Sequence, residues 1–192
     1  MRRLPRTVVC ALLVLAATSS YGAKPKGSSE ELALAKMCAR LSNDRSGAFV
    51  AGDNPATIRL GEKYLRVCNE LDEPSLMASA YGNIAEAQLA MGNLKNALSA
   101  ADLCLAASYV ETGCHVTKAE ALVALSRRKE ALAILDAADL LIVFQAKITK
   151  ERIERGDLRG AELVMTRADA RMIEVSRMRA ATVRYKLESA AN

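Results

Sequence analysis

The sequence has no tryptophan, one histidine, four prolines and ten glycines in 192 residues. So little glycine and proline excludes collagen-like and low-complexity classes. Hydrophobic residues make up 51% of the chain and charged residues 26%, which is too apolar for an intrinsically disordered protein. Neither a Gly-rich phosphate loop nor a Gly-x-Ser-x-Gly elbow occurs. The composition therefore predicts a folded domain of ordinary size that carries no catalytic motif.

The chain also has little net charge once its first segment is set aside. The formal net charge is +5, but Arg2, Arg3 and Arg6 lie in a segment that is predicted to be removed. The rest carries 24 basic against 22 acidic residues, a net charge of +2. That charge is too small to predict a nucleic-acid partner, and few aromatic side chains are available for stacking on bases. Nucleic acid is therefore excluded as an expected partner.

The N-terminal segment has the three-part layout of a secretory signal peptide. Arg2, Arg3 and Arg6 form its positive part, residues 8–17 are an uninterrupted small and apolar run, and small residues follow up to Ala23. The run is about half the ~20 residues that span a bilayer, so a retained anchor is the weaker interpretation. Later segments are too polar to cross a membrane. We therefore predict a signal peptide at 1–23 and a periplasmic or secreted protein without an integral membrane segment.

A period of 34 residues organises the middle of the chain. Gly92 and Ser126 are 34 residues apart, and so are Ala85 and Ala119. The best-formed unit has an aromatic residue, small helix-contact residues and a turn glycine, at Tyr81, Ile84, Ala85, Gly92, Ala97, Ala101 and Cys104. This unit resembles the tetratricopeptide repeat (TPR), and weaker units extend the resemblance over roughly residues 30–168.

The resemblance implies an all-α, TPR-like superhelical solenoid of about four antiparallel helix pairs with a C-terminal capping helix. The repeat domain would comprise residues 24–168, and residues 169–192 would extend the last helix. Helix-start prolines and helix-ending glycines predict eight helices, and no period-2 segment predicts a strand. The expected helices are 28–50, 54–71, 74–91, 93–107, 112–125, 127–138, 140–155 and one from 157 towards Leu187.

The residues that could carry chemistry do not form a recognisable site. His115 follows Cys114 directly, and adjacent helical residues point about 100° apart, so the two cannot act as a base and its nucleophile. Cys104, Cys114 and His115 also lack the spacing of a zinc site. A structural or surface role is therefore favoured for His115. We predict no catalytic residue, no metal and no cofactor, and hence no enzyme.

Four cysteines remain after the signal peptide and its Cys10 are removed, an even number that suits an oxidising compartment. In an antiparallel hairpin, residues equidistant from the turn lie level with each other. Cys38 and Cys68 are centred on the turn at Asp53, and Cys104 and Cys114 on the turn at Tyr109. This layout predicts Cys38–Cys68 and Cys104–Cys114 disulfides over a Cys68–Cys104 pairing. Four buried free thiols are the alternative, since cysteine also serves as a small core residue.

The resemblance also implies that the first helix of each repeat lines a concave groove that binds peptides or partner proteins. Carried over to this chain, the groove positions are Asn83, Glu86, Glu120, Lys147 and Lys150. Ordinary exposed helix surface is the alternative for these residues. The last 52 residues carry 11 basic and 7 acidic residues, and Arg179 and Arg184 belong to a basic stripe that could attract acidic proteins or anionic lipid. Because acidic residues are interleaved, a solvated capping helix is favoured over an interaction stripe.

Together these patterns predict an exported, non-catalytic TPR scaffold that binds a protein or peptide partner in a bacterial cell envelope, as an assembly or secretion accessory. A self-associating structural envelope protein is the main alternative. An unrecognised envelope enzyme is the least favoured one.

Overall fold

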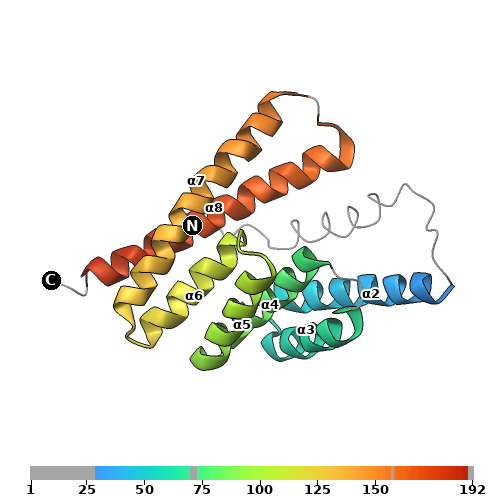
Figure 1. The fold of residues 1–192 in the computed structure, drawn as a ribbon, viewed down its shortest axis with the longest axis horizontal. Coiled ribbons are helices and arrows are strands. Elements are labelled where there is room, and N and C mark those ends of the chain that lie inside the picture. The colour runs from blue at the N-terminus through green and yellow to red at the C-terminus, as the bar shows by residue number, and fades with distance from the viewer. Residues whose placement is uncertain (1–28, 70–72, 157, 190–192) are drawn as a thin grey trace.

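The computed structural model describes residues 29–69, 73–156 and 158–189 of the chain. The predicted signal peptide at 1–23 lies outside these residues, as does Cys10. The described residues form seven helices and no strand (Figure 1). The helices are α2 (Ser29–Ala51), α3 (Asn54–Cys68), α4 (Pro74–Ala90), α5 (Leu94–Ala107), α6 (Thr112–Ala124), α7 (Arg128–Glu154) and α8 (Gly160–Ser189). The predicted all-α class is thus confirmed.

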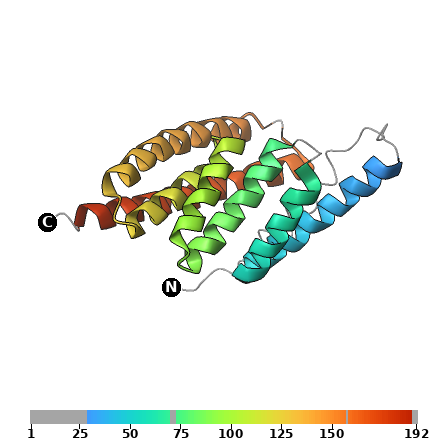
Figure 2. The ribbon, with the colours of Figure 1, turned by 60° about the horizontal axis from the view of Figure 1, so that its bottom comes forward.

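The helices stack in two rows as a solenoid. Each helix packs against the next one in the chain, and α2, α4, α6 and α8 also contact one another in sequence. These four helices form the inner row, whereas α3, α5 and α7 form the outer row. Figure 2 shows α8 running behind α4, α5 and α6, across the array. α8 thus closes the inner row at its C-terminal end, as expected for a capping helix.

One expected helix boundary is wrong. Helices predicted at 127–138 and 140–155 are the single helix α7. Its buried side chains are Ala131, Leu135, Ala138 and Ile142, spaced by four, three and four residues. This apolar stripe continues past the expected break at Asp139, and no glycine or proline lies within the helix. The second half of α7 therefore extends an outer-row helix, and α7 and α8 form a long hairpin that projects from the array (Figure 1).

The same turn ends three of the helices. Gly52 and Gly92 have φ angles of 74° and 76°, and Ser126 takes the equivalent conformation with φ 61°. In each turn the next residue donates its N–H to a carbonyl five residues back: Asp53 to Ala48, Asn93 to Gln88, and Arg127 to Leu122. These bonds satisfy carbonyls that a helix end leaves free. The 34-residue period between Gly92 and Ser126 is therefore a repeat of backbone conformation.

Ser126→Gly is expected to stabilise the protein by about 0.5–1 kcal/mol, because a side chain in the left-handed region is strained and glycine is not. Urea unfolding followed by circular dichroism measures the difference. Gly92→Ser is the matched control, since it places the same side chain in the same turn one repeat earlier. It should destabilise the protein by a similar amount, and equal stability of all three proteins would contradict this account.

Small residues let the helices approach closely. Four alanines spaced along these helices, Ala85, Ala97, Ala119 and Ala131, are fully buried. Larger side chains such as Leu122, Leu135 and Val116 fill the space between helices α6, α7 and α8. None of the helices within the described ranges is long and apolar enough to cross a membrane.

Candidate functional site

The concave surface brings together two of the predicted groove residues. Glu86 lies on α4 and Glu120 on α6, neighbouring helices of the inner row. Between them lies Arg179 of α8, whose Nη1 is 2.7 Å from Glu86 Oε1 and whose Nη2 is 2.6 Å from Glu120 Oε2. Arg179 Nη2 also donates to the hydroxyl of Thr117 at 3.1 Å. We call Glu86, Thr117, Glu120 and Arg179 the concave cluster.

In the concave cluster, one cation is shared by two carboxylates. Burial by itself lowers the pKa of Arg179, but hydrogen bonds and charges from Glu120 and Glu86 outweigh burial and raise the pKa overall. Each of the three charged side chains is about one-quarter to one-third exposed, at 27% for Arg179, 31% for Glu86 and 26% for Glu120. α8 therefore already occupies the part of the concave surface where these two groove residues lie.

The other groove residues are not part of this cluster. Asn83 lies on α4, partly buried, one turn before Glu86. Lys147 and Lys150 are exposed on α7, which belongs to the outer row, and Lys150 pairs with Glu154 at 3.6 Å. The two lysines were expected on the inner row because a separate helix was predicted to begin at residue 140. The structure has no break there, since α7 continues through it.

Three arginines of the last helix, where the sequence favoured a solvated capping helix over an interaction stripe, are paired within the chain. Arg179 belongs to the concave cluster, and Arg184 bonds Asp136 at 2.9 Å and Asp139 at 2.7 Å on α7. Arg177 pairs with Glu174 on its own helix. These three arginines thus hold α8 to the array and to itself.

Replacing Arg179 by methionine is expected to cost about 2–3 kcal/mol, less than a fully buried pair because the cluster is partly exposed. The cost arises because Glu86 and Glu120 would face each other without a cation. Urea unfolding measures it. Adding Glu86→Gln and Glu120→Gln should recover most of the loss, since no carboxylate is then left unpaired. Arg177→Met, on the exposed side of α8, is the control. A loss no larger than this control's would contradict a stabilising role for the concave cluster.

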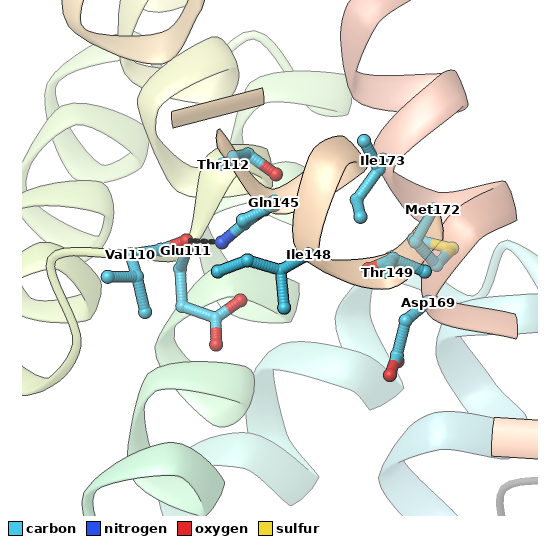
Figure 3. Close-up of a pocket in the computed structure, with 9 residues that line it drawn as sticks. All are labelled: Val110, Glu111, Thr112, Gln145, Ile148, Thr149, Asp169, Met172 and Ile173. Atoms are coloured by element: carbon cyan, nitrogen blue, oxygen red, sulfur yellow. Dashed lines mark hydrogen bonds between the residues drawn. The ribbon is translucent and has the colours of Figure 1, made fainter. Parts of the chain in front are cut away.

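A pocket of about 310 Å³ lies between the start of α6, the second half of α7 and α8. Its walls come from three segments far apart in the sequence (Figure 3). They are Val110, Glu111 and Thr112 at the start of α6, Gln145, Ile148 and Thr149 on α7, and Asp169, Met172 and Ile173 on α8. Gln145 Nε2 donates to the carbonyl of Val110 at 2.7 Å and so fixes α7 against the start of α6.

Two carboxyl groups line this pocket. Glu111 precedes α6 at its N-cap position, yet its side chain makes no capping hydrogen bond to that helix. Burial raises the pKa of Glu111, and the negative charge of Asp169 raises it further. Burial also raises the pKa of Asp169, an effect that the charge of Arg152 partly opposes. Glu111 and Asp169 are 58 residues apart, so no local sequence pattern indicated that they would line the same pocket.

This carboxyl pair predicts a pH dependence of stability. In the unfolded chain these two carboxyl groups titrate near pH 4, and in the folded protein both pKa values are higher. Between the unfolded and folded pKa values, the folded state therefore binds more protons than the unfolded state does. Stability should therefore fall as pH rises from about 4 through the folded pKa values. Glu111→Gln removes this penalty, so it should raise the melting temperature by roughly 1–3 °C at pH 7 and by less at pH 4. Glu151→Gln on α7, outside the pocket, should show no such difference. Equal effects at both pH values would contradict the prediction.

The four cysteines lie as two pairs at disulfide distance. Cys38 and Cys68 have Cα atoms 5.7 Å apart, and Cys104 and Cys114 have Cα atoms 6.3 Å apart. Both separations fall within the range that a disulfide requires. Gly82 on α4 lies against the second pair, since a Cβ there would be 3.0 Å from Cys114 Sγ. These are the two pairings that the helix layout predicted, and whether the thiols are oxidised stays a prediction.

His115 is buried in a structural setting. Its Nε2 lies 2.8 Å from the carbonyl oxygen of Tyr109, and the two rings meet edge to face with centroids 4.9 Å apart. Burial lowers the pKa of His115, so the neutral ring that donates to this carbonyl is favoured. The ring thereby fixes the turn between α5 and α6.

Comparisons with known proteins bear on the fold of this chain and not on its chemistry. No protein-family model matches the sequence, and no curated protein matches it. Among solved structures, the TPR2B-domain:pHsp70 complex of yeast Sti1 is similar, with a TM-score of 0.50 at 16% sequence identity. The match covers 76% of this chain and 96% of that chain. At so low an identity the similarity is one of fold, and at that level it confirms the TPR-like solenoid.

Proposed function

We propose that this chain is an exported, non-catalytic scaffold that binds a protein or peptide partner in a cell envelope, in an assembly or secretion role. A TPR-like solenoid is typical of proteins that act by binding other proteins. The similar Sti1 domain was solved in a complex with pHsp70, which supports the same kind of partner here. The two cysteine pairs at disulfide distance support an oxidising compartment.

One observation carries the proposal: α7 exposes an apolar face on the outside of the solenoid. Leu140 is 75% exposed, Val143 70% and Phe144 61%, and the three lie within about one helical turn. Apolar side chains grouped on a surface in this way mark protein contact sites more often than single exposed residues do. Asn83, Lys147 and Lys150 remain part of the proposed partner surface. At Glu86 and Glu120 a partner would have to replace Arg179.

Affinity capture of the full chain from an envelope extract of its native host tests the proposal. We expect the wild type to recover a defined partner and Val143→Ser/Phe144→Ser to lose it. Met178→Ser, which changes an exposed apolar side chain on α8, is the control and should retain it. Asn83→Ala tests the concave surface in the same way. Recovery of this chain alone would favour the self-associating alternative, and recovery of nothing specific would contradict the scaffold.

Export is tested by mass spectrometry of the protein isolated from its host. We expect an N-terminus between Ser20 and Lys24, because the small residues that permit cleavage lie there. An intact chain that begins at Met1 and is found in the cytosol would contradict export.

A further inference from the structure

The pocket between α6, α7 and α8 combines apolar side chains with two carboxyl groups. Ile173 is buried, and the exposed side chains of Val110, Ile148 and Met172 provide further apolar surface. Figure 3 shows the side chains of Glu111 and Ile148 approaching from opposite walls, with Asp169 further along the opening. A volume of about 310 Å³ lies at the lower end of small-ligand sites and suits one side chain rather than a helix.

Two polar side chains of the wall, Gln145 and Thr112, are engaged in hydrogen bonds, whereas the two carboxylates form no ion pair among the described residues. Gln145 donates to the Val110 carbonyl, and the Thr112 hydroxyl donates to Ser176 at 3.3 Å. Neither Glu111 nor Asp169 forms an ion pair within the described ranges 29–69, 73–156 and 158–189. Arg152, the cation whose charge acts on Asp169, bonds Glu162 at 2.8 Å. The partly buried Glu111 and the exposed Asp169 thus line an open hollow of mixed apolar and polar side chains, and neither has an ion-pair partner in the described part of the chain. A cationic group in this hollow would stabilise both carboxylates.

We infer that this pocket receives a lysine or arginine side chain that stands between apolar residues on the partner, with Glu111 and Asp169 holding its charge. The inference rests on the proposed scaffold function and specifies the partner's chemistry. A long basic side chain matches both features of the pocket, because its aliphatic stem packs on Ile148, Met172 and Ile173 while its charged end reaches the carboxylates. Two carboxylates are too few for a calcium ion, which takes six to eight oxygen ligands.

Titration of the oxidised full chain with three short peptides tests the inference. The probes are acetylated, amidated Leu-Lys-Leu, Leu-Arg-Leu and Leu-norleucine-Leu, and the readout is the methyl NMR shifts of Ile148 and Met172. We expect the two basic peptides to bind with dissociation constants on the order of 1 mM and the norleucine peptide at least five-fold more weakly. Glu111→Gln and Asp169→Asn should each weaken the basic peptides by at least five-fold and leave the norleucine peptide unchanged.

Glu151→Gln is the matched control, since it removes an exposed carboxylate of α7 that does not line this pocket. Equal binding of the basic and norleucine peptides would overturn the inference, and so would equal loss in the control variant. The outcome is separable from that of the capture experiment. If the wild type and Glu111→Gln captured a partner equally well, the scaffold proposal would be supported and the pocket inference would be contradicted. Basic peptides that bind when no partner is captured would support the pocket alone.

Discussion

Ala97→Arg is expected to unfold the middle repeat, with a loss of at least about 3 kcal/mol. Ala97 is fully buried on α5, the helix that packs against α4, and Ala85 and Ala87 of α4 are fully buried as well. Arginine would bring a large side chain and a charge into a space that only a methyl group fills. Both the excess volume and the desolvated guanidinium oppose packing of the two helices.

Thermal unfolding followed by circular dichroism measures this effect. Ala106→Arg is the matched control, because Ala106 is exposed on the same helix and the substitution there is identical. The control should melt within about 2 °C of the wild type, as exposed substitutions cost little. If Ala97→Arg melted equally close to the wild type, the assignment of Ala97 to the helix contact of the repeat would be wrong.

Removal of the cysteine pairs should have the next largest effect. The model in which a cross-link restricts the unfolded chain gives about 3.6 kcal/mol for the 30-residue separation of Cys38 and Cys68. It gives about 2.7 kcal/mol for the 10-residue separation of Cys104 and Cys114. We therefore expect Cys38→Ala/Cys68→Ala to lose more stability than Cys104→Ala/Cys114→Ala.

Urea unfolding with and without reductant separates this effect from packing. Under oxidising conditions both double variants should be less stable than the wild type. Under reductant each should approach the reduced wild type, because the cross-link is then absent from both proteins. Peptide mapping without reduction should recover the 38–68 and 104–114 pairs. Free thiols, or a Cys68–Cys104 peptide, would contradict the pairing.

The local features of the fold were predictable because they depend on residues close together in the sequence. Pro74 begins α4, and Gly92 and Gly156 end helices with positive φ angles, as their types predict. α3 begins at Asn54 as expected, and Asp53 caps it by accepting from the Ala56 N–H at 3.0 Å. The break expected near Asp139 was wrong because the repeat spacing suggested a turn there, while the residues themselves continue a helical stripe.

The long-range features were not predictable in the same way. Arg179 is separated from Glu120 by 59 residues and from Glu86 by 93. On a helix with interleaved charges it has the pattern of a solvated residue, and only the packing of α8 on the inner row reveals its role. In the sequence, the only local signal for this side of α8 is the pair of small residues Ser176 and Ala180 on either side of Arg179. The structure buries both of them. Glu111 and Asp169 likewise line one pocket only because three helices converge there.

The placement of the cysteines has a mechanical consequence. Both pairs lie within α2 to α6, and the α7–α8 hairpin contains no cysteine. In the oxidised protein, a force pulling on the C-terminus would peel α8 and then α7 from the array before it reached a covalent link. The Cys104–Cys114 pair would then resist further extension at the start of α6. The solenoid would thus lengthen under load by its last two helices and by the part of α6 that follows Cys114, while its first helices remained cross-linked in pairs.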